Sequence, residues 1–314
     1  MASHGIDEQR MAEAVEPTQR KLAFAVALTA VVLLAEVGGG FWTRSLALLS
    51  DAAHVLTDLI SLVLSFGAIL MAARPVTKEH TFGWHRVEVL AALTNGLLLL
   101  AISAYLLREA YYRLQDPPEV RVTGMLGVAA AGLLANGLIA FRLRENAHRD
   151  LNIRSAYLHV MADFAGSVGV VVGATIMLAT GWYIVDPVVG IAISLAVLVG
   201  SFRLLRETIH VLLEGVPPNI ELHAVADAIR QVAGVDDIHD LHIWTICSNL
   251  LALSVHITVG DRSAAARDEI VTAVNDELRL RFGITETTIQ TEQDPCRTDE
   301  LIHLVAHQVD SQAQ

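Results

Sequence analysis

The sequence His54-Val-Leu-Thr-Asp58 recurs as His159-Val-Met-Ala-Asp163, and each copy lies within an apolar stretch long enough to cross a membrane. In a helix, residues i and i+4 lie on one face, so each copy presents an imidazole and a carboxylate together. Two such helices packed face to face would bring two nitrogens and two oxygens to one point, a tetrahedral set of the kind that zinc prefers. Ionisable groups are costly inside a bilayer, so we expect these four residues to be functional.

The composition is typical of a membrane protein. Of 314 residues, 53% are hydrophobic and 18% are charged, and the mean hydropathy is +0.48. Soluble domains carry about 25% charged residues. The two cysteines, Cys247 and Cys296, make no disulfide framework, which suits a soluble part in a reducing compartment. The formal net charge is −12, and much of the acid follows residue 214, so we expect that part to attract cations and to repel nucleic acid.

Six apolar segments approach the roughly 20 residues that a membrane span needs. They lie at 22–43, 47–72, 87–112, 122–142, 155–180 and 185–209. Glycine, proline and charged residues between them act as breakers, namely Gly38-Gly39-Gly40 with Thr43-Arg44, Arg74-Pro75, Asp116-Pro117-Pro118, Gly181-Trp182 and Asp186-Pro187. Residues 1–20 are polar and lack the apolar core of a signal peptide.

Lys and Arg collect at one side of these segments, which fixes the expected orientation. The other side receives only Arg44, Arg113 and Arg121 near the ends of the spans. We therefore expect the basic side, with both termini, to be cytoplasmic.

The character of the chain changes near Glu214. The pattern predicts helices over 219–232 and 263–281, the second capped by Ser263, and strands over 238–246, 250–259 and 285–291. The order αββαβ is typical of a small two-layer α+β domain. We therefore expect four parts, namely a polar segment over 1–20, a membrane domain over 21–213, a soluble domain over 214–295 and a polar tail over 296–314.

The motifs in combination resemble the cation diffusion facilitator family, the zinc transporter group that includes bacterial zinc-cadmium-cobalt resistance exporters. The resemblance covers roughly residues 20–296 and is carried by 45–58 (SLALLSDAAHVLTD), 81–92 (TFGWHRVEVLAA), 159–169 (HVMADFAGSVG), 211–217 (VLLEGVP) and 239–244 (HDLHIW). It implies a homodimeric exchanger of cytosolic divalent metal for protons in the cell membrane. It also implies six membrane helices and a ferredoxin-like cytoplasmic domain that dimerises.

The resemblance assigns the transport site to His54, Asp58, His159 and Asp163. The alternative is that these are buried polar residues that hold helices together. Asp51 lies three residues before His54 and would either orient an imidazole or lie in water at a helix end.

Outside the spans, His80 occupies a position where the family binds a second metal, although Thr77 stands where a carboxylate would help. His80 otherwise is a solvated loop histidine. Arg86 and Glu88 are expected to make the charge contacts that join the membrane part to the soluble part. Asn95 and Asn136 are expected to make hydrogen bonds between helices.

In the soluble part, five residues resemble the family's cytoplasmic metal sites, namely His239, His242, His256, Glu292 and Asp294. His239 and His242 are three apart and so are expected on opposite faces of a strand. The alternative is ordinary surface histidines. We expect at least one structural zinc here and no other cofactor. Cys296 and the tail pair His303 and His307 are weaker candidates.

Three other classes of protein need consideration. An intramembrane metallopeptidase would have a glutamate after the first histidine, but Val55 and Val160 stand there, so we expect no enzyme. A channel would need rings of polar residues along a pore. A non-transporting metal sensor or heteromeric partner of the same fold would have no need of ligands in mid-membrane. The expected mechanism is alternating access, in which protons and metal compete for the same His and Asp atoms.

Overall fold

The structure of the protein is a computed structural model, which describes residues 26–72, 74, 77–144, 151–247 and 250–293. A helix over Val26–Thr43 is followed by α2 (Leu46–Ala72), α3 (Arg86–Gln115), α4 (Val122–Arg144), α5 (Leu151–Thr180), α6 (Val185–Leu212), α7 (Leu222–Arg230), β1 (Asp237–Cys247), β2 (Leu250–Thr258), α8 (Ala264–Phe282) and β3 (Glu286–Glu292). Close contacts group the residues up to Gly67 with Ala91–Leu205, and Ala68–Leu90 with the residues from Arg206 onward. The polar segment over 1–20 and the tail over 296–314 lie outside the described residues.

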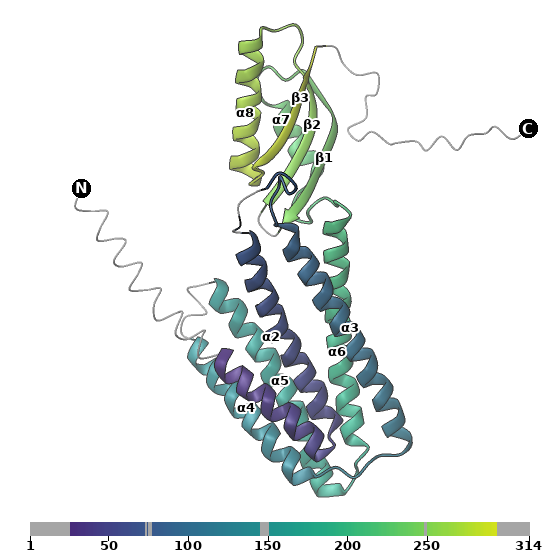
Figure 1. Ribbon diagram of the computed structural model, residues 1–314. Helices are drawn as coiled ribbons and strands as arrows, with labels where there is room; N and C mark the ends of the chain where they lie inside the picture. Colours follow the sequence, from purple (N-terminus) through teal and green to yellow (C-terminus); the bar gives the residue numbers. More distant parts are fainter. Residues whose placement is uncertain (1–25, 73, 75–76, 145–150, 248–249, 294–314) are drawn as a thin grey trace, which may run out of the picture. The chain divides into compact units, whose positions relative to one another are not determined.

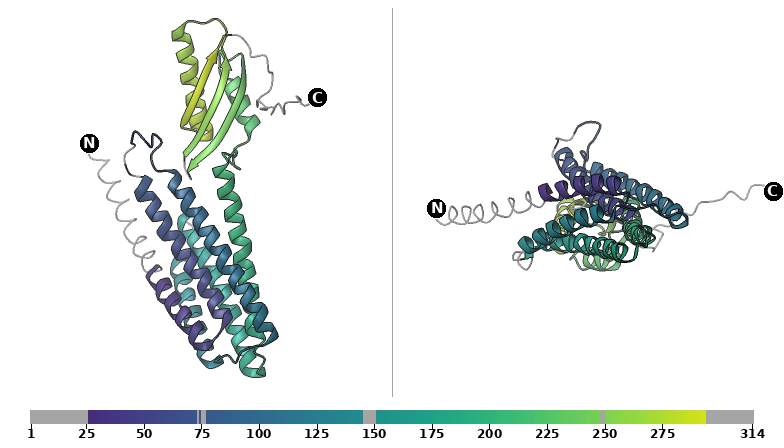
Figure 2. Two further views of the ribbon diagram at one scale, coloured as in Figure 1. Left: turned by 45° about the vertical axis from the view of Figure 1, so that its right-hand side comes forward. Right: turned by 90° about the horizontal axis from the view of Figure 1, so that it is seen from below.

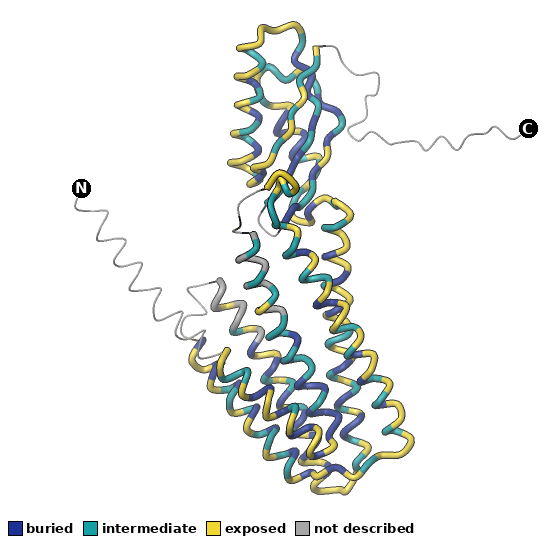
Figure 3. Tube along the Cα trace, viewed as in Figure 1, coloured by how far each residue is buried: buried dark blue, intermediate teal, exposed yellow. Residues whose placement is uncertain are grey.

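The first part is a bundle of membrane helices (Figures 1 and 2). Five helices in the described part of the chain are long and apolar enough to cross a membrane. The sixth, α2, has 27 residues and is about 40 Å long, which exceeds the hydrocarbon thickness of about 30 Å. Many large apolar residues of these helices are exposed, and Leu134 is 75% exposed. Figure 3 shows exposed residues along the helices of the bundle. Such a surface suits lipid, and the predicted six-helix membrane fold is confirmed.

The glycine triplet Gly38-Gly39-Gly40 does not interrupt the first helix, contrary to its expected role as a breaker. The helix continues to Thr43, and the chain turns at Arg44, which has φ 61°. A Cβ on Gly39 would lie 2.8 Å from Val128 of α4, and a Cβ on Gly40 would lie 2.7 Å from Leu49 of α2. The glycines therefore allow the first helix to approach two neighbouring helices closely.

A carboxylate of α6 caps the beginning of α2. The Asp186 oxygens accept hydrogen bonds from Ser45 Oγ at 2.6 Å, Leu46 N at 2.6 Å and Ala47 N at 3.2 Å. The first turn of a helix has N–H groups without partners and a positive dipole end, so a carboxylate satisfies both. Arg113 Nη1 of α3 lies 3.9 Å from the same carboxylate, which joins three helices at one point. The sequence marks Asp186 only as part of a breaker.

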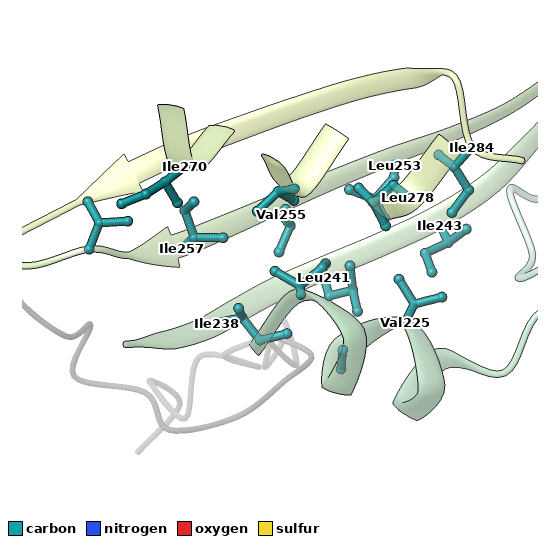
Figure 4. Close-up of a cluster of buried hydrophobic side chains, with 14 residues drawn as sticks. Val225, Ile238, Leu241, Ile243, Leu253, Val255, Ile257, Ile270, Leu278 and Ile284 are labelled. Atoms are coloured by element: carbon teal, nitrogen blue, oxygen red, sulfur yellow. The ribbon is translucent and has the colours of Figure 1, made fainter. Parts of the chain in front are cut away.

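The C-terminal part contains a three-stranded sheet in the order β1-β2-β3. β1 and β2 are antiparallel, whereas β2 and β3 are parallel and are connected through α8, as a parallel pair requires. One apolar core joins α7, α8 and one face of the sheet, with Val225, Ile243, Val255 and Leu278 among its residues (Figure 4). Both helices therefore cover the same face, and the predicted αββαβ order is confirmed.

Element ends differ from expectation by a few residues. The helix expected over 219–232 is shorter, covering Leu222–Arg230, and the strand expected over 285–291 covers Glu286–Glu292. The predicted cap is present, because Ser263 Oγ accepts a hydrogen bond from Ala266 N at 3.3 Å.

Candidate metal centres

One face of α2 lines a cavity within the membrane bundle. Asp51, His54 and Asp58 follow one another at intervals of three and four, so they share one side of the helix. The cavity has a volume of about 580 Å³. Much of its remaining wall comes from small residues of α5 and α6, including Gly166 and Gly200, which leave room for an ion and its ligands.

Three of the four predicted transport ligands converge, and two of them, His54 and Asp58, line this cavity. His54 Nδ1 lies 3.8 Å from Asp58 Oδ2, and His54 Nε2 lies 3.4 Å from Asp163 Oδ1. One ligand atom from each residue can be chosen so that all three lie within 4.8 Å of one another. Two atoms bound at about 2.1 Å to a tetrahedral zinc are about 3.4 Å apart, so small side-chain rotations would complete the geometry.

The fourth ligand stays a prediction. His159 lies on α5 one turn before Asp163, but its side chain is outside the described part of the structure. Asp163 itself is buried, at 6% exposed, and lies beside His54. Residues i and i+4 of a helix share one face, which is why the sequence predicts His159 as the partner of Asp163.

Asp51 belongs to a chain of hydrogen bonds across three helices. Its Oδ2 accepts a hydrogen bond from Ser167 Oγ of α5 at 3.4 Å, and Ser167 Oγ accepts one from Asn136 Nδ2 of α4 at 3.3 Å. Asn136 therefore has its predicted interhelical role. Asp51 is buried rather than exposed at a helix end, and it lies close enough to His54 for an electrostatic interaction. Asn95 is buried on α3.

Glu36 of the first helix is a further buried acid near this site. Its side chain is 1% exposed, and it interacts electrostatically with Asp51 and Asp163. Gly132 of α4 makes room for it, because a Cβ there would lie 2.7 Å from Glu36 Oε1. No motif contains Glu36, and the only signal in the sequence is a carboxylate inside an apolar span, which is costly unless it has a role.

A bulge in β1 changes which face His242 occupies. His239 pairs with His256 and His242 pairs with Ser254, so three steps along β1 match two steps along β2. Asp240, with φ 54°, takes up the extra residue. The expectation that His239 and His242 face opposite sides is therefore wrong. Both share the face opposite the helices.

A compact cluster forms on that face of the sheet. His239 Nε2 lies 3.3 Å from Glu292 Oε2, and His256 Nδ1 lies 3.2 Å from Glu292 Oε1. The two imidazole rings meet edge to face at 5.2 Å, and His239 is only 7% exposed. Two imidazoles and a carboxylate within 4.8 Å of one another make a three-ligand set suited to zinc.

Asp240 connects this cluster to His242. Its Oδ1 lies 3.1 Å from His242 Nε2, and its Oδ2 lies 3.7 Å from His256 Nε2. Asp240 could not be predicted from the sequence, because the bulge brings it beside two histidines that a regular strand would separate. His242 is exposed and lies outside the three-residue set, whereas Asp294 lies outside the described residues.

His80 is held by other contacts. Its ring stacks on Trp84 with centroids 4.0 Å apart, and its backbone N–H donates to Thr77 Oγ1 at 3.1 Å. No group of three metal-type ligands among the described residues includes His80. The junction metal site at His80 stays a prediction. Arg86, by contrast, makes a predicted charge contact, because its Nη2 lies 2.9 Å from Glu214 Oε1.

The remaining weak candidates add no ligand set to the described part. Cys247 is buried and free. Cys296, His303 and His307 lie outside the described residues.

The cation efflux transmembrane domain matches residues 22–213, and the cytoplasmic domain of cation efflux proteins matches residues 217–294. The chain belongs to the cation diffusion facilitator family. It is therefore a multi-pass membrane transporter of divalent metal cations and not an enzyme.

Relatives with transport names cover most of the chain. The metal cation efflux system protein CzcD of Cupriavidus metallidurans is 44% identical over 278 residues, which are 88% of each chain. The cadmium, cobalt and zinc/H(+)-K(+) antiporter of Bacillus subtilis is 41% identical over 86% of this chain and 88% of its own. The zinc transporter ZitB of Escherichia coli is 37% identical over 88% of each.

A solved structure also matches part of the chain. It is the metal-bound C-terminal domain of the CzcD transporter from Cupriavidus metallidurans, with 34% identity, 23% of this chain and 99% of that chain covered, and a TM-score of 0.22.

Proposed function

We propose that the protein exports cytosolic zinc in exchange for protons, by alternating access around His54, Asp58, His159 and Asp163. The observation that carries this proposal is the convergence of His54, Asp58 and Asp163, of which His54 and Asp58 line a cavity inside the membrane bundle. Both copies of the repeated motif supply residues to that point. A purely structural role for the histidine and the acids would not require a space beside them.

The ligand types favour zinc as the substrate. Two imidazole nitrogens and two carboxylate oxygens suit tetrahedral zinc, and they also accept cobalt and cadmium. Magnesium and manganese prefer more oxygen ligands. The names of the relatives from Bacillus subtilis and Escherichia coli, which mention cadmium, cobalt and zinc, support the same substrates here.

Competition between protons and metal provides the exchange. A histidine binds metal when neutral and an aspartate when ionised, so metal binding releases protons. A free imidazole titrates near pH ~6.5, within physiological reach. Two aspartates balance the charge of a divalent ion, which lowers the cost of holding it in the bilayer. Opening outward would load protons and release metal, and opening inward would reverse both.

The cytoplasmic part has a separate proposed role. His239, His256 and Glu292 are proposed to hold a structural zinc, with Asp240 and His242 beside them. The domain is proposed to form a homodimer. The basic side of the spans is proposed to face the cytosol at the cell membrane, inner or plasma, with both termini there.

Zinc uptake into proteoliposomes with an imposed pH gradient tests the exchange. With an acidic lumen, zinc flux from outside should exceed the flux without a gradient, and a protonophore should remove the difference. Full zinc flux that ignores both the gradient and the protonophore would overturn proton coupling. Zinc binding without any flux would favour the alternative, a non-transporting sensor that uses only the cluster around His239.

A further inference from the structure

The first helix carries a carboxyl group deep in the bundle that the four-ligand site does not use. Glu36 is 1% exposed, and its Oε2 has no hydrogen-bond partner among the residues that the structure describes. Its other oxygen, Oε1, lies against Gly132 of α4, where any larger residue would collide with it. The fold therefore keeps a space for this carboxyl group, although no hydrogen bond or ion pair among the described residues explains the space.

The charged neighbours of Glu36 are acids. Asp51 on α2 and Asp163 on α5 both interact with it electrostatically. α4 has no titratable side chain between Val122 and Phe141. Among the described side chains, no Lys or Arg forms an ion pair with Glu36. The described basic group of the transport site is the His54 imidazole, which lies beside Asp58 and Asp163.

The charge of the transport site with and without metal affects the protonation of Glu36. A zinc ion at the site balances the two negative charges of Asp58 and Asp163. Without metal those two charges remain, and Asp51 and Glu36 would add two more in a medium of low dielectric. Carboxylates that share such a site cannot all be ionised, so protons must take the place of the missing ion.

We propose that Glu36 binds a proton when metal leaves the transport site and releases that proton when zinc binds. The proton leaves the Glu36 carboxyl oxygen and the carboxylate remains, while the two charges of zinc remove the repulsion from Asp163. Asp51 interacts electrostatically with Glu36 and also lines the cavity, so it connects Glu36 to the transport site. Glu36 thus carries part of the counter-ion, and this role rests on the proposed exchange of zinc for protons.

Proton release on zinc binding measures this role directly. Purified protein in detergent and weak buffer is titrated with zinc while a pH indicator counts the protons. Glu36→Gln should bind the same amount of zinc as the wild type but release about one proton fewer per zinc. Asp116→Asn, which removes an exposed carboxylate in the loop after α3, is the matched control and should behave as the wild type.

The outcomes separate the two proposals. Equal proton counts in wild type and Glu36→Gln would overturn the role of Glu36 and leave proton exchange standing. No proton release from the wild type would overturn proton exchange itself, and the role of Glu36 with it.

An infrared measurement on the wild type avoids any dependence on how well Glu36→Gln folds. Protein labelled with ¹³C-carboxyl glutamate should show a protonated glutamate band without metal, and zinc should abolish it. The absence of a zinc-sensitive protonated glutamate band would overturn the proposal.

Discussion

Asp163 and Asp58 differ in how far water reaches them, although both belong to the proposed transport site. Asp163 is buried, while Asp58 is half-buried and lines the cavity. Each carboxylate neutralises one of the two positive charges of a bound divalent ion. Both are therefore needed to hold zinc inside the bilayer, where an unbalanced charge is costly.

We expect Asp58→Ala or Asp163→Ala to reduce zinc flux to background while leaving the protein folded. Each change removes one of four ligands and leaves the bound ion with an unbalanced charge. Vesicle flux and size-exclusion profiles measure the two effects, with Asp116→Asn as the control. Flux near the wild-type level in both alanine variants would refute the assignment of the site.

Selectivity belongs to the same residues. His54→Asp replaces a nitrogen ligand by oxygen, so the variant should lose discrimination of zinc against cadmium or manganese. Competition for flux, with each rival metal added to zinc, measures the ranking in both proteins. An unchanged ranking would mean that His54 does not set selectivity.

At the scale of elements, the bulge in β1 decides the composition of the cytoplasmic cluster. Asp240 has φ 54°, a conformation that asparagine and glycine tolerate and β-branched residues do not. The bulge brings His242 to the same face as His239, and Ile238, Leu241 and Ile243 face the core.

Asp240→Val should therefore destabilise the protein by about 1–2 kcal/mol, because valine is strained in the left-handed region. Asp240→Asn keeps the backbone conformation, so its melting temperature should equal that of the wild type. Thermal unfolding of the full chain in detergent compares the three proteins. If valine and asparagine variants melt together, the backbone at this position is not under the constraint described.

The cap that α6 provides for α2 makes a second prediction. Asp186→Ala removes the acceptor for Ser45, Leu46 and Ala47 and leaves Arg113 without its partner on α6. The loss of a helix cap alone costs about 0.5–2 kcal/mol, so the melting temperature should fall clearly below that of Asp116→Asn. Equal melting temperatures would show that the cap contributes nothing to stability.

The elements were predictable where their cause is local. The lengths of the apolar runs give six helices, and alternation with turn residues gives αββαβ, because both patterns are properties of neighbouring residues. The His54 and Asp58 pair follows from helical spacing. The bulge depends on how β1 pairs with β2, and the location of Glu36 depends on how the first helix packs on α4, so neither follows from spacing along the chain.

At the scale of the whole molecule, metal and protons compete for the same histidine nitrogens and aspartate oxygens. Lowering the pH protonates histidine and aspartate, which disfavours the bound metal. The direction is fixed, since acid must weaken zinc binding and base must strengthen it until the ligands are fully deprotonated.

The zinc dissociation constant of the membrane site should therefore rise steadily as the pH falls from about 7.5 to about 5.5, across the range in which imidazole titrates. A His239→Ala, His256→Ala double variant removes the cytoplasmic cluster from the measurement, so calorimetry reports the membrane site. A dissociation constant that does not change with pH would contradict competition between protons and zinc.

Asp186 also makes the start of α2 a fulcrum. If this end of α2 stays fixed, the helix can tilt only about it, and the displacement of each residue grows with its distance from that end. His54 lies about 12 Å along the helix from Leu46, and Asp58 lies about 18 Å along it. A tilt of α2 against α6 about Asp186 therefore displaces Asp58 about 1.5 times as far as His54. Such a tilt would separate Asp58 from the other ligands before it separates His54.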